Sequence, residues 1–150
     1  MKARRIGMAV VTIAAMLAMA NGASATQPQP VTITVVTDIG GFEDPFDAAG
    51  GLVCAAGTVS NAGGNFIGWQ SGFQAQIILV KHFECPDGSF DVLLRVTLDF
   101  ATGDTVGTWS VLRGTGAYAS LHGAGSLTGE KSDPTDETIL DVYTGAMHID

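Results

Sequence analysis

The sequence predicts an all-β domain of seven or eight short strands, arranged as a barrel or a sandwich. Segments rich in β-branched or alternating apolar residues recur along residues 31–149, and turn residues separate them. Residues 107–129 then read as strand, glycine corner, tight turn and strand, with Gly114 and Gly116 bending the chain. Such a corner is typical of a small barrel, whose closure removes exposed strand edges.

The first residues have the pattern of a secretory signal peptide. A basic start is followed by an apolar run over residues 6–20 and a small-residue cleavage site at 23–25. The basic residues are Lys2, Arg4 and Arg5. The apolar run is shorter than the about 20 residues that cross a bilayer, so a transmembrane anchor is the weaker interpretation. We therefore expect residues 1–25 to be a signal-peptide helix, and the mature protein to be secreted or periplasmic without stable membrane insertion.

The rest of the chain is expected to form one domain. Residues 26–30 are predicted to be a flexible N-terminus, and residues 31–150 the β-domain. Without residues 1–25 the chain keeps four basic and fifteen acidic side chains, a formal net charge of −11. A surface of this charge repels phosphate backbones, which argues against nucleic acid and anionic membranes as partners.

The strands are expected where apolar residues alternate or β-branched residues cluster. Residues 42–51 are acidic and bounded by glycine, which predicts a loop, and residues 61–65 form a turn cluster. Further loops are expected at 102–104 and 131–137. The expected strands are 31–37, 52–59, 66–72, 73–85, 89–101, 106–113, 121–129 and 138–149.

The turn at residues 86–88 decides which side chains enter the interior. Taken as a three-residue loop, it turns His82 and Glu84 inward. A two-residue loop would send Lys81 inward instead. We favour the three-residue loop because it keeps an unpaired lysine out of the core.

Cys54 and Cys85 are expected to form a disulfide, because an exported chain with two cysteines meets an oxidising compartment. The alternatives are a nucleophilic thiol and a zinc site with His82. Zinc needs four tetrahedral ligands, which no close pairing supplies. The acidic loop 131–137 lacks the spacing of a calcium-binding loop. No metal and no cofactor are therefore expected.

Two polar pairs are the candidates for chemistry. His82 and Glu84 share a strand face, as an acid–base pair or as a solvated pair at the barrel rim. Tyr143 and Asp141 share another face. The Tyr143 hydroxyl could orient a ligand or donate a proton, or Asp141 could hold it while the ring fills the interior. Trp109 and Tyr118 read as packing residues.

Residues 109–125 and 141–148 together carry a family resemblance. They resemble the C-terminal half of bacterial secreted proteins with an allene oxide cyclase-like barrel, and plant dirigent proteins are similar at Gly-Thr-Gly 114–116. Weaker similarity covers 54–59 and 81–88. The resemblance implies a single antiparallel eight-stranded barrel with a largely apolar lumen. Family members cyclise an epoxide, steer radical coupling or shape pericyclic cyclisations, which is catalysis by positioning.

Two classes of function remain open at this stage. One is an exported barrel that binds a small hydrophobic ligand in its lumen, with His82, Glu84 and Tyr143 near the ligand, or that serves a structural role. The alternative is a cofactor-free cyclase or isomerase acting on a hydrophobic substrate in the lumen. A cavity of ~300 Å³ or more with convergent polar groups would favour ligand handling. The sequence leaves open whether the protein forms a homo-oligomer.

Overall fold

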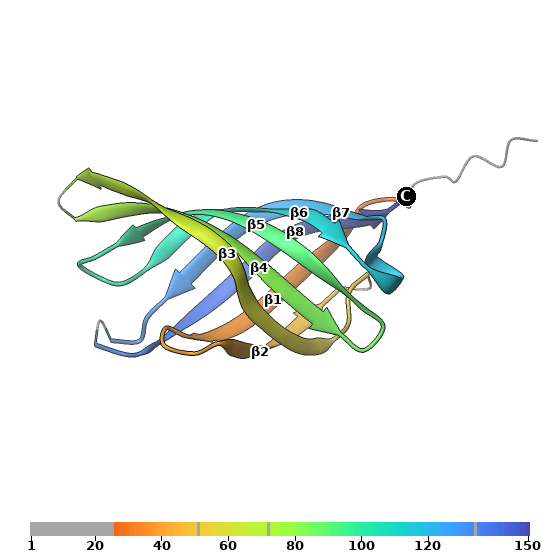
Figure 1. Cartoon of the computed structure of the whole chain (residues 1–150), viewed down its shortest axis with the longest axis horizontal. Helices are drawn as coiled ribbons and strands as arrows, with labels where there is room; N and C mark the ends of the chain where they lie inside the picture. Colours follow the sequence, from red (N-terminus) through yellow and green to blue (C-terminus); the bar gives the residue numbers. More distant parts are fainter. Residues whose placement is uncertain (1–25, 51, 72, 134) are drawn as a thin grey trace, which may run out of the picture.

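A closed antiparallel β-barrel of eight strands makes up the computed structural model, in the order β1 to β8 along the chain (Figure 1). The structure describes residues 26–50, 52–71, 73–133 and 135–150. The all-β, eight-stranded barrel predicted above is thereby confirmed. The predicted signal peptide, residues 1–25, lies outside the described residues.

Each strand pairs with its sequence neighbours, and β1 pairs with β8 to close the barrel. A short 3-10 helix, η1, lies between β6 and β7 at Gly116–Tyr118. The strands are β1 Gln29–Asp38, β2 Glu43–Ala49, β3 Ala56–Ser71, β4 Gln74–Cys85, β5 Gly88–Asp99, β6 Thr105–Gly114, β7 Leu121–Glu130 and β8 Thr138–Ile149. No helix in the described ranges is long and apolar enough to span a membrane.

The second and third strands differ from the prediction. β2 occupies the segment expected as a loop, because Asp44 and Phe46 alternate inward between exposed neighbours. An inward carboxylate breaks the apolar periodicity that would have revealed this strand. The turn cluster expected at 61–65 lies within β3, where a register shift between Asn61 and Gly63 accommodates the extra residue.

The hairpin between β4 and β5 has a two-residue loop, so the predicted orientation of its side chains is wrong. Cys85 pairs with Gly88, and Phe83 pairs with Phe90. His82 and Glu84 therefore face outward, and Lys81 faces the interior.

Aromatic packing and the charges around Lys81 together explain this register. The observed register buries Phe83, whose ring stacks on Phe90 with centroids 4.9 Å apart. Burying a large apolar side chain contributes about 1.5–3 kcal/mol. The inward lysine is not isolated, because the carboxylates of Asp44 and Asp141 also point inward and offset its charge.

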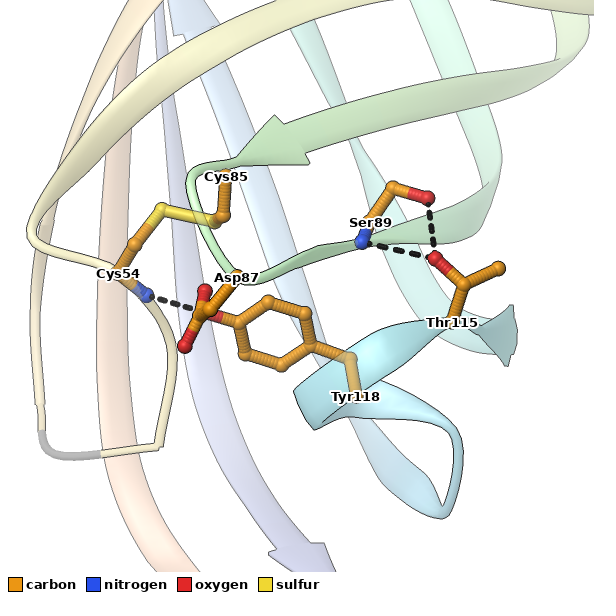
Figure 2. Close-up of a disulfide and its surroundings, with 6 residues drawn as sticks. All are labelled: Cys54, Cys85, Asp87, Ser89, Thr115 and Tyr118. Atoms are coloured by element: carbon orange, nitrogen blue, oxygen red, sulfur yellow. Dashed lines mark hydrogen bonds between the residues drawn. A yellow bond between two sulfur atoms is a disulfide. The ribbon is translucent and has the colours of Figure 1, made fainter.

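One end of the barrel is closed by aromatic rings and by the predicted disulfide between Cys54 and Cys85, which is present (Figure 2). The Tyr118 hydroxyl donates to Asp87 Oδ1 at 2.8 Å and accepts from the Cys54 amide at 3.1 Å. A packed aromatic core, the disulfide and the hydrogen bonds of Tyr118 therefore stabilise this end. The buried aromatic residues are Phe46, Phe83, Phe90, Trp109, Tyr118 and Tyr143.

The glycine corner supports the same end. Gly116 has a φ of +56°, as expected of a residue that bends the chain at a corner. A Cβ at Gly116 would also meet the carbonyl oxygen of Asp87 in the β4–β5 turn. The two turns therefore pack directly on each other.

The two ends of the barrel wall lie side by side at this closed end. The Thr26 amide donates to the Ile149 carbonyl at 2.8 Å, and the Ile149 amide donates to Thr26 Oγ1 at 2.8 Å. β1 begins at Gln29, inside the segment expected as a flexible N-terminus. The loops β1–β2, β3–β4, β5–β6 and β7–β8 all lie at the opposite end (Figure 1).

Candidate functional site

The barrel encloses a cavity of about 380 Å³ that reaches the end carrying the β1–β2, β5–β6 and β7–β8 loops. Its wall is mainly aliphatic, because period-2 alternation turns one face of each strand inward. The aliphatic lining residues are Ile77, Leu79, Leu94, Val96, Leu98, Leu127 and Ile139.

The deep end of the cavity is polar. On β4 the lining ends at Lys81, and on β8 it ends at Asp141. The next inward residues, Phe83 and Tyr143, are 0% and 1% exposed and close the space behind them. An apolar chamber thus ends on a lysine and a carboxylate.

Three charged side chains share this buried region. Lys81 is 5% exposed, Asp44 6% and Asp141 8%. Asp141 Oδ2 accepts a hydrogen bond from Thr37 Oγ1 at 2.7 Å, and Asp44 Oδ1 accepts one from the Asp38 amide at 2.9 Å. Within the described part of the chain, the Lys81 ammonium makes no hydrogen bond and no direct ion pair. The two carboxylates therefore act on it through space.

Burial favours the uncharged forms of the Lys81 and Asp141 side chains. Desolvation lowers the pKa of Lys81, against the opposing charges of Asp141 and Asp44. Desolvation also raises the pKa of Asp141, against the hydrogen bond from Thr37, the charge of Lys81 and the nearby Thr105 hydroxyl. A lysine and a carboxyl group whose proton affinities converge are suited to exchanging a proton.

Two buried hydroxyl groups lie beside this cluster. Tyr143 Oη has no hydrogen-bond partner among the described residues, and Thr105 Oγ1 lies next to Asp141 without the geometry of a regular hydrogen bond. Thr105 is 9% exposed and lines the cavity close to Asp141. The Tyr143 hydroxyl lies deeper, and burial together with the charges of Asp141 and Asp44 raises its pKa. Of the two, only Thr105 lines the cavity, so its hydroxyl is the one available to a bound molecule.

Of the predicted site residues, Tyr143 lies inside the barrel. Its ring packs edge-on against Phe83, with centroids 5.8 Å apart, and it shares the inner face of β8 with Asp141. Asp141 does not hydrogen-bond its hydroxyl, contrary to one of the two interpretations of this pair. Tyr143 sits directly behind the polar end of the cavity rather than on its wall.

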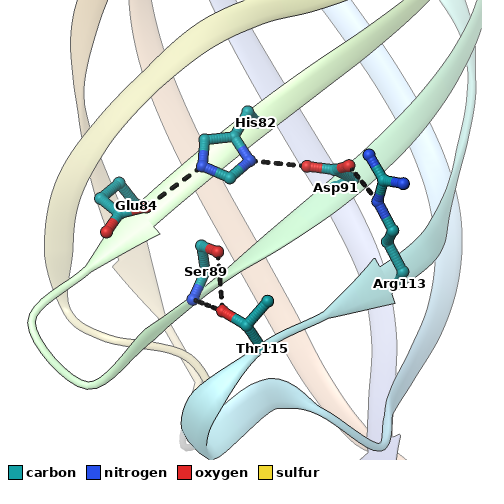
Figure 3. A network of polar contacts seen from close by, with 6 residues as sticks. All are labelled: His82, Glu84, Ser89, Asp91, Arg113 and Thr115. Atoms are coloured by element: carbon teal, nitrogen blue, oxygen red, sulfur yellow. Dashed lines mark hydrogen bonds and ion pairs between the residues drawn. The ribbon is translucent and has the colours of Figure 1, made fainter.

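The other two predicted residues, His82 and Glu84, form a network on the outer face of the barrel (Figure 3). His82 Nδ1 lies 2.6 Å from Asp91 Oδ1, and His82 Nε2 lies 3.1 Å from Glu84 Oε2. Arg113 Nε donates to Asp91 Oδ2 at 2.7 Å. The structure therefore separates His82 and Glu84 from Tyr143 and from the cavity.

The electrostatics of this outer network follow from Asp91, which is covered by its two basic neighbours. The hydrogen bond to Asp91 raises the pKa of His82. Burial alone would raise the pKa of Asp91, but the hydrogen bonds from His82 and Arg113 hold it below its usual value. The network joins β4, β5 and β6 across the outside of the wall.

Sequence reasoning missed Lys81, Asp44 and Thr105 as parts of the interior site. One signal was present: Asp141 shares its strand face with apolar residues, so a carboxylate was already expected inside. A buried carboxylate calls for a cation, and Lys81 is the basic residue that one change of register turns inward. Thr105 starts a strand beside a loop and carries no local signal of this kind.

Exposed apolar side chains lie at the open end of the barrel, and two of them, Ile39 and Phe100, line the cavity. Ile39, Phe42, Phe73 and Phe100 are all exposed, and all lie in loops or strand ends at the open end. Asp38, Asp99 and Lys131 also line the cavity near these loops.

Comparisons of the chain with models of protein families, with curated proteins and with solved structures gave no match.

Proposed function

We propose that this chain is an exported barrel that binds a small hydrophobic ligand in its lumen. The observation that carries the proposal is the cavity of about 380 Å³, with an aliphatic wall and a few polar groups gathered at its deep end. Ligand pockets usually have this composition and a volume in this range. A barrel with a purely structural role needs no such chamber.

Two further observations support the proposal. The disulfide between Cys54 and Cys85 fits an oxidising compartment outside the cytoplasm, and hence export. An eight-stranded barrel with an apolar lumen is also what the resemblance to allene oxide cyclase-like and dirigent-like proteins implies, and we propose membership of that family.

A second candidate, a cofactor-free isomerase or cyclase, draws on one observation. Lys81 and Asp141 lie at the end of an apolar chamber, and burial brings their proton affinities together. A substrate held against them would meet a proton donor and a proton acceptor. Turnover of a bound ligand would be the result that separates this candidate from simple binding.

The binding proposal is tested with a neutral fluorescent probe, N-phenylnaphthylamine, and a matched pair of variants. Leu79→Trp fills the cavity from its wall, whereas Leu112→Trp makes the same change on an exposed site of β6. We expect Leu79→Trp to weaken probe binding at least about tenfold, with no change for Leu112→Trp. Circular dichroism would confirm that both variants fold. Equal binding by the two would refute a lumenal site.

A further inference from the structure

We propose that Lys81 is a carbonyl-reactive amine, and that the lumen takes up an apolar aldehyde or ketone and holds it as an imine on Lys81 Nζ. This inference rests on the proposed function, because it requires a ligand in the lumen. It adds the chemical class of the ligand and the atom that binds it.

The position of Lys81 is the first argument. Its side chain is 5% exposed, its ammonium has no hydrogen-bond partner in the described ranges, and it lies where the aliphatic chamber ends. A buried polar group retained for stability is normally paired. A lysine desolvated in an apolar pocket is instead the usual source of a nucleophilic amine for imine formation, because burial favours its neutral form.

The neighbours of Lys81 are the second argument, since imine formation also needs a site for the oxygen atom. Thr105 lines the cavity, and its buried Oγ1 lies next to Asp141 Oδ1 beside Gly129. Asp141 lines the same cavity, and its Oδ2 accepts the hydrogen bond from Thr37. A hydroxyl group that can donate to the carbonyl oxygen and a carboxylate that can carry a proton therefore line the same cavity as the amine.

The reaction uses only the amine and the carbonyl compound. Neutral Lys81 and protonated Asp141 form the starting pair. The Lys81 nitrogen attacks the carbonyl carbon, the C–N bond forms as the C=O π bond breaks, and the carbonyl oxygen takes the proton of Asp141. The nitrogen then gives one of its own protons to the Asp141 carboxylate. Asp141 then returns its proton to the resulting hydroxyl group. That group leaves as water while the nitrogen lone pair forms the C=N bond. No atom changes its overall oxidation level, so no oxidant or reductant is required.

The charges of the site favour a neutral carbonyl compound over an anionic ligand. Asp44 and Asp141 already place two carboxylates near one lysine. A ligand carboxylate would add a third negative charge to this buried region at a high desolvation cost. A protonated imine, by contrast, keeps the positive charge of the lysine in place and in the field of the same two carboxylates.

The test is reductive trapping on the purified full chain. The protein is incubated with octanal and sodium cyanoborohydride, digested, and mapped by mass spectrometry. We expect one main adduct, with the mass of the aldehyde less one oxygen atom, on Lys81. Lys131 provides an internal comparison, because it also lines the cavity but its Nζ donates to the Asp136 carbonyl at 2.7 Å. Prior occupation of the lumen by N-phenylnaphthylamine should suppress the adduct.

Two variants sharpen the result. Lys81→Arg keeps the positive charge but cannot form an imine, and should reduce trapping at least about tenfold, whereas Arg95→Gln on the exposed outer face of β5 should leave it unchanged. If Lys81→Arg fails to fold, the map of the unmodified chain decides, since it needs no variant. Equal labelling of Lys81 and Lys131, or no label on Lys81, would overturn the inference. Probe binding that persists without a Lys81 adduct would leave the lumenal function standing, and loss of both would reject the two together.

Discussion

Lys81 and Phe83 occupy successive inward positions on β4, and the energetics of this pair decide the face that the strand presents. Turning Phe83 outward would expose a ring that now contacts Phe46, Phe90 and Tyr143. Turning Lys81 inward costs desolvation, which the charges of Asp44 and Asp141 offset. The free energy gained by burying Phe83, together with the charges of the two carboxylates, exceeds the cost of desolvating Lys81.

Replacement of Lys81 by Met should therefore destabilise the barrel even though methionine is apolar. It leaves two buried carboxylates without the cation that offsets them, and the cost should lie below the about 3–5 kcal/mol of a broken direct pair, because Lys81 acts on them through space. Burial already raises the pKa of Asp141, so the folded state takes up a proton more readily than the unfolded state as the pH falls. The difference from wild type in urea denaturation should thus shrink under acid conditions. A deficit that is independent of pH would contradict this account.

His82 should make a small, pH-dependent contribution on the outer face. Its pKa is raised above the ordinary 6.5, chiefly by the hydrogen bond to Asp91. The added stability is complete below pH 6.5 and is lost as the pH rises through the higher pKa of the folded state. Since the His82 side chain is 38% exposed, solvent screening keeps the effect under about 1 kcal/mol.

The measurement for His82 compares thermal unfolding of wild type and His82→Gln across this range. Wild type should lose its advantage as the pH rises above 6.5, and titration by nuclear magnetic resonance should give His82 a raised pKa. An identical pH profile for the two proteins would show that the network contributes nothing to stability.

At the scale of the elements, the closed end depends on the connection between β2 and β3. The described part of this connection, residues 52–55, is tied to the end of β4 by the disulfide and to η1 by the Tyr118 hydroxyl. β3 begins only at Ala56, and a backbone hydrogen bond from the Ala48 amide to the Ala55 carbonyl at 2.8 Å joins the end of the connection to β2. The covalent bond therefore reinforces a segment that the strand ladders hold only at its end.

Loss of the disulfide, by Cys54→Ala together with Cys85→Ala, should lower the free energy of unfolding by about 2–5 kcal/mol. Denaturation with and without a reductant provides the same comparison on the natural sequence. Tyr118→Phe is the companion variant, since it keeps the ring and removes only the hydrogen bonds to Asp87 and Cys54. We expect its loss to be smaller, about 1–3 kcal/mol. Equal stability of the oxidised and reduced forms would exclude this role for the bond.

At the scale of the whole molecule, the sequence was sufficient for the fold class and for the strands with regular patterns. The apolar alternation from Phe90 to Val96 and the glycine corner at 114–116 are local patterns, which can be recognised in the sequence itself. β2 could not be recognised in this way, because Asp44 and Pro45 interrupt its apolar pattern.

The candidate site was harder to predict than the fold, and the reason is physical. The inward face of Asp141 and Tyr143 followed from period-2 alternation. The orientation of Lys81 depended on one residue of register in a turn, and that register was set by contacts between strands distant in sequence. Such contacts have no local signature.

The hydrogen bonds between Thr26 and Ile149 have a practical consequence for engineering. Because the wall begins and ends at one place, a short glycine linker from Asp150 to Thr26 can join the ends, and new termini can open in the β5–β6 loop at residues 102–103. Such a circular permutant should retain the β-type circular dichroism spectrum of the natural order. A permutant opened within β4, between Lys81 and His82, should not, because it cuts a strand paired on both sides. Either end of the barrel wall can also carry a surface tether while the entrance remains turned toward solution.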